Sequence, residues 1–286
     1  MYTVQQGFSY GRPPKQLLKW VGNKHRYAGT IAALVPTRMR KYIEPFVGTG
    51  AVLGTVSPDT GLAGDALEPL IGIWHLVQRD PDTLINHYER TLAAYQESPD
   101  ETYIRVRDSF NRSPNPLDLT FLSRSCYGGV VRFTMKGAMS TPRGPHPPIS
   151  ARSFAERVYT WQERVKNTTF VHADYHDTMA EAGRGDVVYC DPPYAYSQSI
   201  LYGAQQFDLE KLWLAIDGAA LRGAKVLMSI DGRKNSGRTR LRIDMPEGLF
   251  RREMLIDLGP SMLRRFQMEG QSMDGEVVHD RLLLTW

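Results

Sequence analysis

Short apolar runs recur along the chain, and each ends at glycine or a polar residue. They lie at 41–48, 60–65, 168–174, 186–191 and 224–231. Continuous apolar runs of this length are typical of strands buried on both faces of a parallel sheet. Between them, residues 208–223 carry apolar positions at helical spacing, with Asp208 placed to cap the first turn and Gly223 to end the last. Strands that alternate with helices predict a doubly wound α/β sheet.

The alternation stops between residues 68 and 165. Helix-like segments and proline-rich loops take its place, at 82–97, 100–110, 113–116 and 141–148. We therefore predict one discontinuous domain, formed by residues 1–67 and 166–286, with a mainly helical insertion at 68–165. Two further strand-like runs, at 251–259 and 277–286, are expected to pair as a terminal antiparallel hairpin.

Composition places the chain among ordinary globular proteins. It has 286 residues, of which 42% are hydrophobic and 23% charged. No run approaches the ~20 consecutive apolar residues of a membrane span, and residues 1–15 lack the pattern of a secretory signal. The only cysteines, Cys126 and Cys190, indicate a reducing compartment without disulfides. We expect a cytoplasmic protein, and no pattern in the sequence demands more than a monomer.

The distribution of charge says more than its total. The net charge is +4, but six basic residues face a single acid, Glu156, between positions 124 and 157. Tyr127 and Phe133 are interleaved with these charges, next to Gly128. A basic stretch alone is most often a solvated face, whereas this mixture of cations, aromatic rings and glycine favours a nucleic-acid contact surface.

A pair of glycines, Gly48 and Gly50, follows the first predicted strand. Glycine there allows a sharp turn and the close approach of a ligand. Asp65 ends the next strand, where an acid accepts hydrogen bonds from ribose hydroxyls in dinucleotide-type folds. Leu53 stands where a third glycine would complete the pyrophosphate-binding motif. The pattern therefore favours a nucleoside ligand without a pyrophosphate, such as S-adenosylmethionine.

The run at 186–191 ends in Asp191, Pro192, Pro193 and Tyr194. The prolines have no N–H to donate and hold φ near −65°. This rigid turn presents a carboxylate and carbonyl oxygens at the carboxyl end of a strand, where open α/β sheets bind ligands. Acceptors without donors suit an amino group as substrate, and the ring of Tyr194 offers a surface on which a planar group can stack.

Taken in order, these motifs resemble those of DNA adenine-N6 methyltransferases of the Dam family, the D12 class. The matching stretches are LLKWVGNK (17–24), EPFVGTGAV (44–52), AGDALEPLI (63–71), DYHDTM (174–179), DVVYCDPPYA (186–195) and SRSCYGGVVRFTMKGAMSTPRG (123–144). The resemblance covers nearly the whole chain. It implies a Rossmann-like methyltransferase sheet with helices on both faces and an inserted, mainly helical DNA-recognition domain. It also implies S-adenosylmethionine as cofactor and double-stranded DNA as partner.

The resemblance assigns the cofactor site to Trp20, Lys24, Phe46, Gly48, Gly50, Asp65, Asp174 and Asp191. Trp20 would lie on the adenosyl portion, Lys24 near its charged end, and Asp65 on the ribose. Asp191 would also accept from the adenine amino group, with the Pro192 carbonyl as second acceptor. Tyr194 would stack on the base. A base inside a duplex cannot reach such a pocket, so it would be flipped out at a cost of a few kcal/mol.

The same resemblance places the DNA contacts at Lys19, Arg124, Tyr127, Gly128, Val130, Arg132, Lys136 and Pro142. Arg132 is the best candidate for bidentate contact with a guanine. Tyr127 would wedge beside the flipped adenine, and Val130 and Pro142 would make apolar contacts. The chain has Gly128 where the family often has asparagine. A GATC-like target is expected, although this departure affects how the orphaned partner base is held.

Several alternatives remain open from the sequence. Acceptor loops of this type also serve cytosine N4, RNA bases and protein amides, and a fold of this kind can bind DNA without catalysis. Aspartate before the two prolines favours adenine, and the basic insertion favours DNA. His172 and His176 are four residues apart, but they straddle a strand end and have no cysteine at ligand spacing. We therefore predict no metal site.

Overall fold

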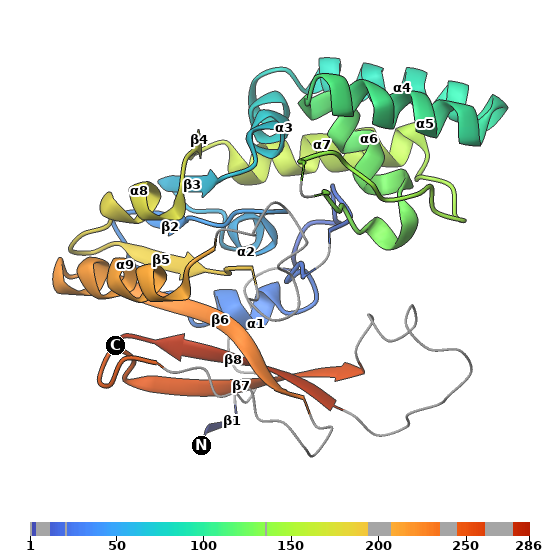
Figure 1. The fold of residues 1–286 in the computed structure, drawn as a ribbon. Coiled ribbons are helices and arrows are strands. Elements are labelled where there is room, and N and C mark those ends of the chain that lie inside the picture. The colour runs from blue at the N-terminus through green and yellow to red at the C-terminus, as the bar shows by residue number, and fades with distance from the viewer. Residues whose placement is uncertain are drawn as a thin grey trace.

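The computed structural model describes residues 2–3, 12–20, 22–134, 136–193, 207–234, 245–260 and 277–286. Within them, one sheet has the strand order β1-β7-β8-β6-β5-β2-β3-β4 (Figure 1). Its strands are β1 Tyr2–Thr3, β2 Tyr42–Glu44, β3 Gly61–Asp65, β4 Thr168–His172, β5 Val187–Cys190, β6 Lys225–Lys234, β7 Arg252–Pro260 and β8 Val277–Leu284. The five apolar runs of the sequence thus form β2 to β6, in chain order.

The central strands are parallel, as the apolar runs predicted. β2 pairs in parallel with β3 and β5, β3 with β4, and β5 with β6. Every residue of β2 and β5 is buried. β8 runs antiparallel to both β6 and β7, which confirms that the two C-terminal strands pair with each other. The α/β prediction is therefore confirmed.

Helices cover the sheet and make up most of the predicted insertion. They are α1 Ala28–Ala32, α2 Ala51–Val56, α3 Glu68–Arg79, α4 Pro81–Glu97, α5 Pro99–Arg112, α6 Pro116–Ser125, the 3-10 turn η1 Tyr127–Gly129, α7 Ala151–Val165, α8 Tyr175–Ala180 and α9 Leu209–Leu221. Proline opens α4, α5 and α6, where its missing N–H costs no helical hydrogen bond. Asp208 caps α9 as expected, accepting from the backbone N–H groups of Glu210 and Lys211.

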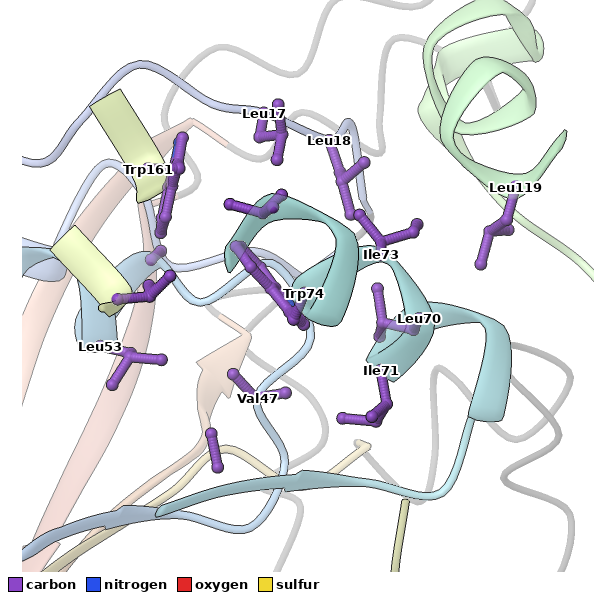
Figure 2. Close-up of a cluster of buried hydrophobic side chains, with 14 of the residues drawn as sticks. Leu17, Leu18, Val47, Leu53, Leu70, Ile71, Ile73, Trp74, Leu119 and Trp161 are labelled. Carbon is purple, nitrogen blue, oxygen red and sulfur yellow. The ribbon is translucent and has the colours of Figure 1, made fainter. Parts of the chain in front are cut away.

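The apolar core divides at the sheet. On one face, α8 and α9 bury a cluster that includes Val188, Trp213 and Ile216. On the other face, one core cluster includes residues of the sheet and of α3 to α7. Figure 2 shows the part of this cluster around Trp74 and Trp161. Trp74 of α3 and Trp161 of α7 pack together there, with ring centroids 5.2 Å apart. α3 contacts the strands β3 and β4 as well as the helices α4 and α6 of the predicted insertion. These contacts do not separate the two predicted domains, so the boundaries at 68 and 165 stay a prediction.

The strand order creates one topological switch point. The chain leaves β2 to form β3 and β4 on one side, and later returns to form β5 and β6 on the other. Ligands of open α/β sheets bind in the crevice beyond the carboxyl ends of the strands at such a point. The glycine loop follows β2 and Asp191 follows β5, so both predicted motifs meet at this crevice. None of the described helices is long and apolar enough to cross a membrane.

Candidate active site

The loop after β2 depends on two glycines in left-handed conformations. Gly48 has φ +47° and Gly50 has φ +63°, where any residue with a Cβ is strained. A Cβ on Gly50 would also come within 3.2 Å of the buried Trp74 ring, whereas one on Gly48 would meet no atom within 4 Å. Trp74 donates its indole N–H to the Gly48 carbonyl at 3.1 Å. Gly50 is therefore needed for packing, and Gly48 borders open space.

Asp65 ends β3 beside this loop. Its Oδ2 accepts from the backbone N–H of Gly48 at 3.1 Å, and its Oδ1 from that of Leu67 at 3.0 Å. Burial raises the pKa of Asp65, and the two N–H donors oppose that shift. Each oxygen keeps a further lone pair for a hydroxyl donor. The carboxylate and the open space at Gly48 therefore fit the ribose of a nucleoside cofactor.

An aromatic cluster joins the glycine loop to α8. The ring of Phe46 stacks on Tyr175 with centroids 5.2 Å apart, and Phe207 meets Phe46 edge-on at 6.0 Å. Asp174 caps α8 by accepting from the backbone N–H of His176 at 2.8 Å. The sequence pointed to Phe46 and Asp174 but missed Tyr175 and Phe207. The position of Tyr175, directly after the predicted Asp174, was the available signal.

Asp191 lies at the centre of a polar network. Lys24 Nζ is 2.7 Å from its Oδ1, and Ser229 Oγ donates to the same oxygen at 2.8 Å. The hydroxyl of Tyr189 is 3.0 Å from Ser229 Oγ. Since Ser229 gives its only proton to Asp191, Tyr189 must donate to Ser229. Among the described residues, no hydrogen bond or ion pair reaches Oδ2 of Asp191, which is left available as an acceptor.

Ser229 could not be identified from the sequence. It is fully buried on β6, 38 residues after Asp191. Only the parallel register between β5 and β6, in which Cys190 pairs with Met228, brings it next to the carboxylate. Lys24 was predicted to lie near the charged end of the cofactor, and the structure also brings it to Asp191.

A second carboxyl group, that of Glu44, lies near Asp191. Glu44 is buried at the end of β2 and accepts from the Tyr42 hydroxyl at 2.9 Å. Burial raises the pKa of Glu44 well above its ordinary value, and the charge of Asp191 adds to the shift. A protonated Glu44 avoids like-charge repulsion with Asp191.

The two prolines continue from Asp191 as expected, Pro192 buried and Pro193 partly exposed. Tyr194 lies outside the described residues, so its predicted stacking role stays a prediction. Trp20 is partly buried and packs against the core that α3 and α7 share.

Four of the eight predicted DNA-contacting residues lie on a hairpin, which we call the recognition hairpin (residues 130–134 and 136–142). Its side chains alternate between the interior and solvent, with Phe133 pairing with Met139 on the buried side. Asn111 of α5 fixes it through two hydrogen bonds to the Met139 backbone, at 2.7 and 3.1 Å. The exposed predicted contacts are Tyr127, Gly128, Arg132, Lys136 and Pro142, and Val130 is partly exposed.

Two left-handed glycines, Gly128 at φ +63° and Gly129 at φ +68°, shape the turn that carries Tyr127. A Cβ on Gly129 would lie 2.6 Å from the Cβ of Lys19, so this turn packs directly on Lys19. Lys19 is partly buried, and burial together with the charge of Arg124 lowers its pKa. Lys19 therefore packs against the turn that carries Tyr127, so these two predicted DNA-contacting residues are close together.

The structure does not support the direct DNA contact that we predicted for Arg124. Its side chain is only 3% exposed. Its Nη1 donates to the carbonyl oxygens of Leu17 at 2.8 Å and Gln16 at 3.2 Å. Charge counting along the sequence could not reveal that this arginine points inward.

The histidine pair weighed as a metal site forms no such group in the part of the chain that the structure describes. His172 Nε2 lies 3.1 Å from the Ala66 carbonyl. No three His, Cys, Asp or Glu side chains of the described residues are placed to hold a metal ion.

Comparison with known proteins finds a matching family model and similar chains. The family model for the D12 class N6 adenine-specific DNA methyltransferase matches residues 20–237. The DNA adenine methylase of Serratia marcescens is 34% identical over 189 residues, which are 63% of this chain and 67% of that protein. The corresponding protein of Escherichia coli K12 is 30% identical, over 63% of this chain and 65% of its own length.

A DNA N-6-adenine-methyltransferase of Escherichia phage P1 is 29% identical over 77% of this chain, but that match is only 30% of the phage protein. The matches thus span about two thirds of the two bacterial relatives and less than a third of the phage protein. Likeness to solved structures is weak: the rRNA methyltransferase aviRa of Streptomyces viridochromogenes has a TM-score of 0.36 and 13% identity over 91% of this chain and 83% of its own. Because the family model covers most of the chain, the protein belongs to the D12 class of N6 adenine-specific DNA methyltransferases.

Proposed function

We propose that this family member moves a methyl group from S-adenosylmethionine to N6 of an adenine flipped out of duplex DNA, with Asp191 as the principal acceptor of the amino group. One observation carries the proposal. Asp191 follows β5 at the switch point, and both Lys24 and Ser229 bind its Oδ1. That leaves Oδ2 as the oxygen for a ligand. A carboxylate held in this way fits an amino group, which donates but scarcely accepts.

The cofactor fits the loops after β2 and β3. The open space at Gly48 admits a ligand against the backbone, the Asp65 carboxylate keeps lone pairs for ribose hydroxyls, and Phe46 offers an aromatic face. Trp20, Lys24 and Asp174 complete the proposed set. When bound, S-adenosylmethionine supplies a methyl group that its sulfonium already activates. The protein therefore contributes mainly position, which is worth up to ~7–11 kcal/mol in well-oriented reactions.

The Asp191 loop makes the adenine nitrogen reactive. The N6 lone pair is delocalised into the ring, which makes the amino group a poor nucleophile. Hydrogen bonds from N6 to Asp191 Oδ2 and to the Pro192 carbonyl favour tetrahedral geometry and free that lone pair. As the bond from N6 to the methyl carbon forms and the bond from that carbon to the sulfonium sulfur breaks, the Asp191 carboxylate would hold the proton that N6 releases. Pro193 has no N–H, so it places no competing donor there.

The insertion at residues 68–165 is proposed to read the DNA. Arg132 and Lys136 are exposed on the recognition hairpin without an ion pair to any described carboxylate, and Tyr127 is 42% exposed on the adjoining turn. Arg132 fits bidentate contact with guanine, and Tyr127 fits the space that a flipped base leaves. A GATC-like target, a cytoplasmic location and a monomeric state are parts of the proposal.

The test is methyl transfer from radiolabelled S-adenosylmethionine to duplex DNA, with duplex RNA as competitor. The wild-type protein should label adenine N6 in DNA and ignore the RNA. Asp191→Ala should abolish labelling and leave DNA affinity largely intact, because the Asp191 carboxylate is negatively charged and offers no attraction to phosphate. Labelled cytosine, preferred labelling of RNA, or an active Asp191→Ala variant would refute the proposal.

A further inference from the structure

The segment before Lys24 is held by side chains from the insertion. Residues 15–17 form no helix or strand, yet each of their carbonyl oxygens accepts a hydrogen bond from α6 or α7. Trp161 donates to Lys15 at 2.8 Å, and Arg157 to Gln16 at 2.5 Å. Arg124 donates to Leu17 at 2.8 Å. The position of this segment is therefore set by the insertion, next to the core in Figure 2 that contains Leu17 and Trp161.

One buried cation, Arg124, and one partly buried cation, Arg157, are an expensive way to satisfy these carbonyls. No described carboxylate forms an ion pair with Arg124 or Arg157, and the Nε atoms of both are buried without a hydrogen-bond partner among the described residues. Burial lowers the pKa of Arg124 to about 10, and the charge of Arg157 contributes to that shift. A neutral donor would avoid this desolvation cost, as Trp161 does for Lys15. A purely structural role therefore does not explain why arginine, and not a neutral donor, binds these carbonyls at both positions.

The held segment leads directly to the catalytic carboxylate. Gln16 donates its side-chain amide to Asn23 Oδ1 at 2.8 Å, and Asn23 donates to the Trp20 carbonyl at 2.7 Å. These bonds close the chain into a loop that ends at Lys24, whose Nζ reaches Asp191. A displacement of Gln16 thus moves Asn23 and, with it, the backbone of the adjacent Lys24.

The same arginines are close to the DNA-contacting turn. Arg124 lies in the last turn of α6, three residues before the exposed Tyr127. The turn rests on the segment at Lys19, where Gly129 leaves no room for a Cβ. Arg157 contributes to the lowered pKa of Lys19, which places it in the same group of charges. The segment between Lys15 and Lys24, with the hydrogen bonds that hold it, therefore connects the Tyr127 turn to Lys24.

We propose that Arg124 and Arg157 are positioning residues that couple DNA recognition to methyl transfer. They hold the Gln16 and Leu17 carbonyls. When the Tyr127 turn contacts DNA, this keeps Lys24 in position beside Asp191. The inference rests on the proposed function and names residues that act through others. Misplacement of a reacting group by about 1 Å can cost on the order of 100-fold in rate, so a modest shift of the segment is enough.

The experiment compares Arg157→Gln and Arg157→Lys with Arg152→Gln. Arg152 lies on the same helix, is 90% exposed and pairs with Glu156 alone among the carboxylates of the described residues. It is therefore a matched control for loss of positive charge. Three quantities are measured: the single-turnover methyl-transfer rate at saturating DNA and cofactor, the Kd for duplex DNA at two salt concentrations, and the Tm. We expect Arg157→Gln to lose at least about tenfold in rate with a Kd changed by less than about twofold, and Arg152→Gln to match wild type.

The lysine variant keeps the charge but loses the planar guanidinium, so it should show an intermediate rate and remain testable if Arg157→Gln fails to fold. A lower Tm with an unchanged rate in the folded protein would mean a purely structural role and overturn the proposal. A weaker Kd with a smaller salt slope and an unchanged rate would mean a direct phosphate contact and also overturn it. Wild-type protein that methylates no DNA would instead refute the proposed function itself.

Discussion

Ser229→Ala tests the network around Asp191 most sharply among the single substitutions. The change removes a hydroxyl that donates to Asp191 Oδ1 at 2.8 Å and takes away the acceptor of the Tyr189 hydroxyl. A hydrogen bond to a charged group contributes about 1.5–3 kcal/mol. If that bond orients Oδ2 in the transition state, its loss lowers the rate by about 10- to 150-fold, at about 1.4 kcal/mol per tenfold.

The assay is single-turnover methyl transfer to a duplex that contains the target site, together with urea unfolding of each variant. Ser229→Ala should also lose about 1–3 kcal/mol of unfolding free energy, because the buried Tyr189 hydroxyl loses a partner. Adding Tyr189→Phe should restore much of that stability without restoring the rate. Thr102→Val is the control: it removes a buried hydroxyl that donates to the Ala94 carbonyl, within the insertion.

Stability and rate separate the two roles that Ser229 can have. A Ser229→Ala protein that is less stable but transfers methyl at the wild-type rate would contradict the orienting role. A rate loss equal to that of Thr102→Val would show that the effect is general to buried hydroxyls.

Three further predictions follow from single residues. Gly50→Ala should lose about 1–2 kcal/mol of unfolding free energy, since φ is +63° and the new Cβ would press on the Trp74 ring. Urea unfolding measures this loss against the control Gly183→Ala, whose Cβ would meet no atom within 4 Å. Equal losses in the two variants would contradict the prediction. Glu44→Gln should gain in Tm relative to wild type as the pH rises above 4.5. The pKa of Glu44 is raised in the folded protein, so the wild-type protein loses stability as the pH climbs from that ordinary value toward the folded pKa, whereas the glutamine variant does not. Parallel plots of Tm against pH for the two proteins would argue against burial as the cause. Arg132→Gln should relax sequence choice by about 1–3 kcal/mol at one base pair, which methylation of a randomised duplex library detects, and an unchanged profile would remove Arg132 from base readout.

The sequence predicted those parts of the fold that depend on local pattern. β2 and β5 appear as apolar runs because every residue in them is buried, whereas the edge strand β4 exposes Thr169 and His172. The Gly48 loop and the Asp191 turn follow directly from strand ends. Residues whose role depends on register were not accessible. Ser229 looks like any small residue in a buried strand until β6 is aligned with β5.

Burial of individual charges was equally hidden. Arg124 and Arg132 are eight residues apart in one basic stretch, and nothing in their spacing separates the inward arginine from the exposed one. The difference arises because Arg124 belongs to the last turn of α6, which faces the N-terminal segment, whereas Arg132 lies on the solvent side of the recognition hairpin. Tertiary packing, and not local pattern, decides between them.

The most direct test of the account is single-molecule sequencing of plasmid DNA from cells that express the wild-type protein or Asp191→Ala. The account predicts N6-methyladenine in one defined sequence context with the wild-type protein and none with Asp191→Ala. N4-methylcytosine, absence of any modified base, or adenine methylation that persists in the Asp191→Ala cells would contradict it.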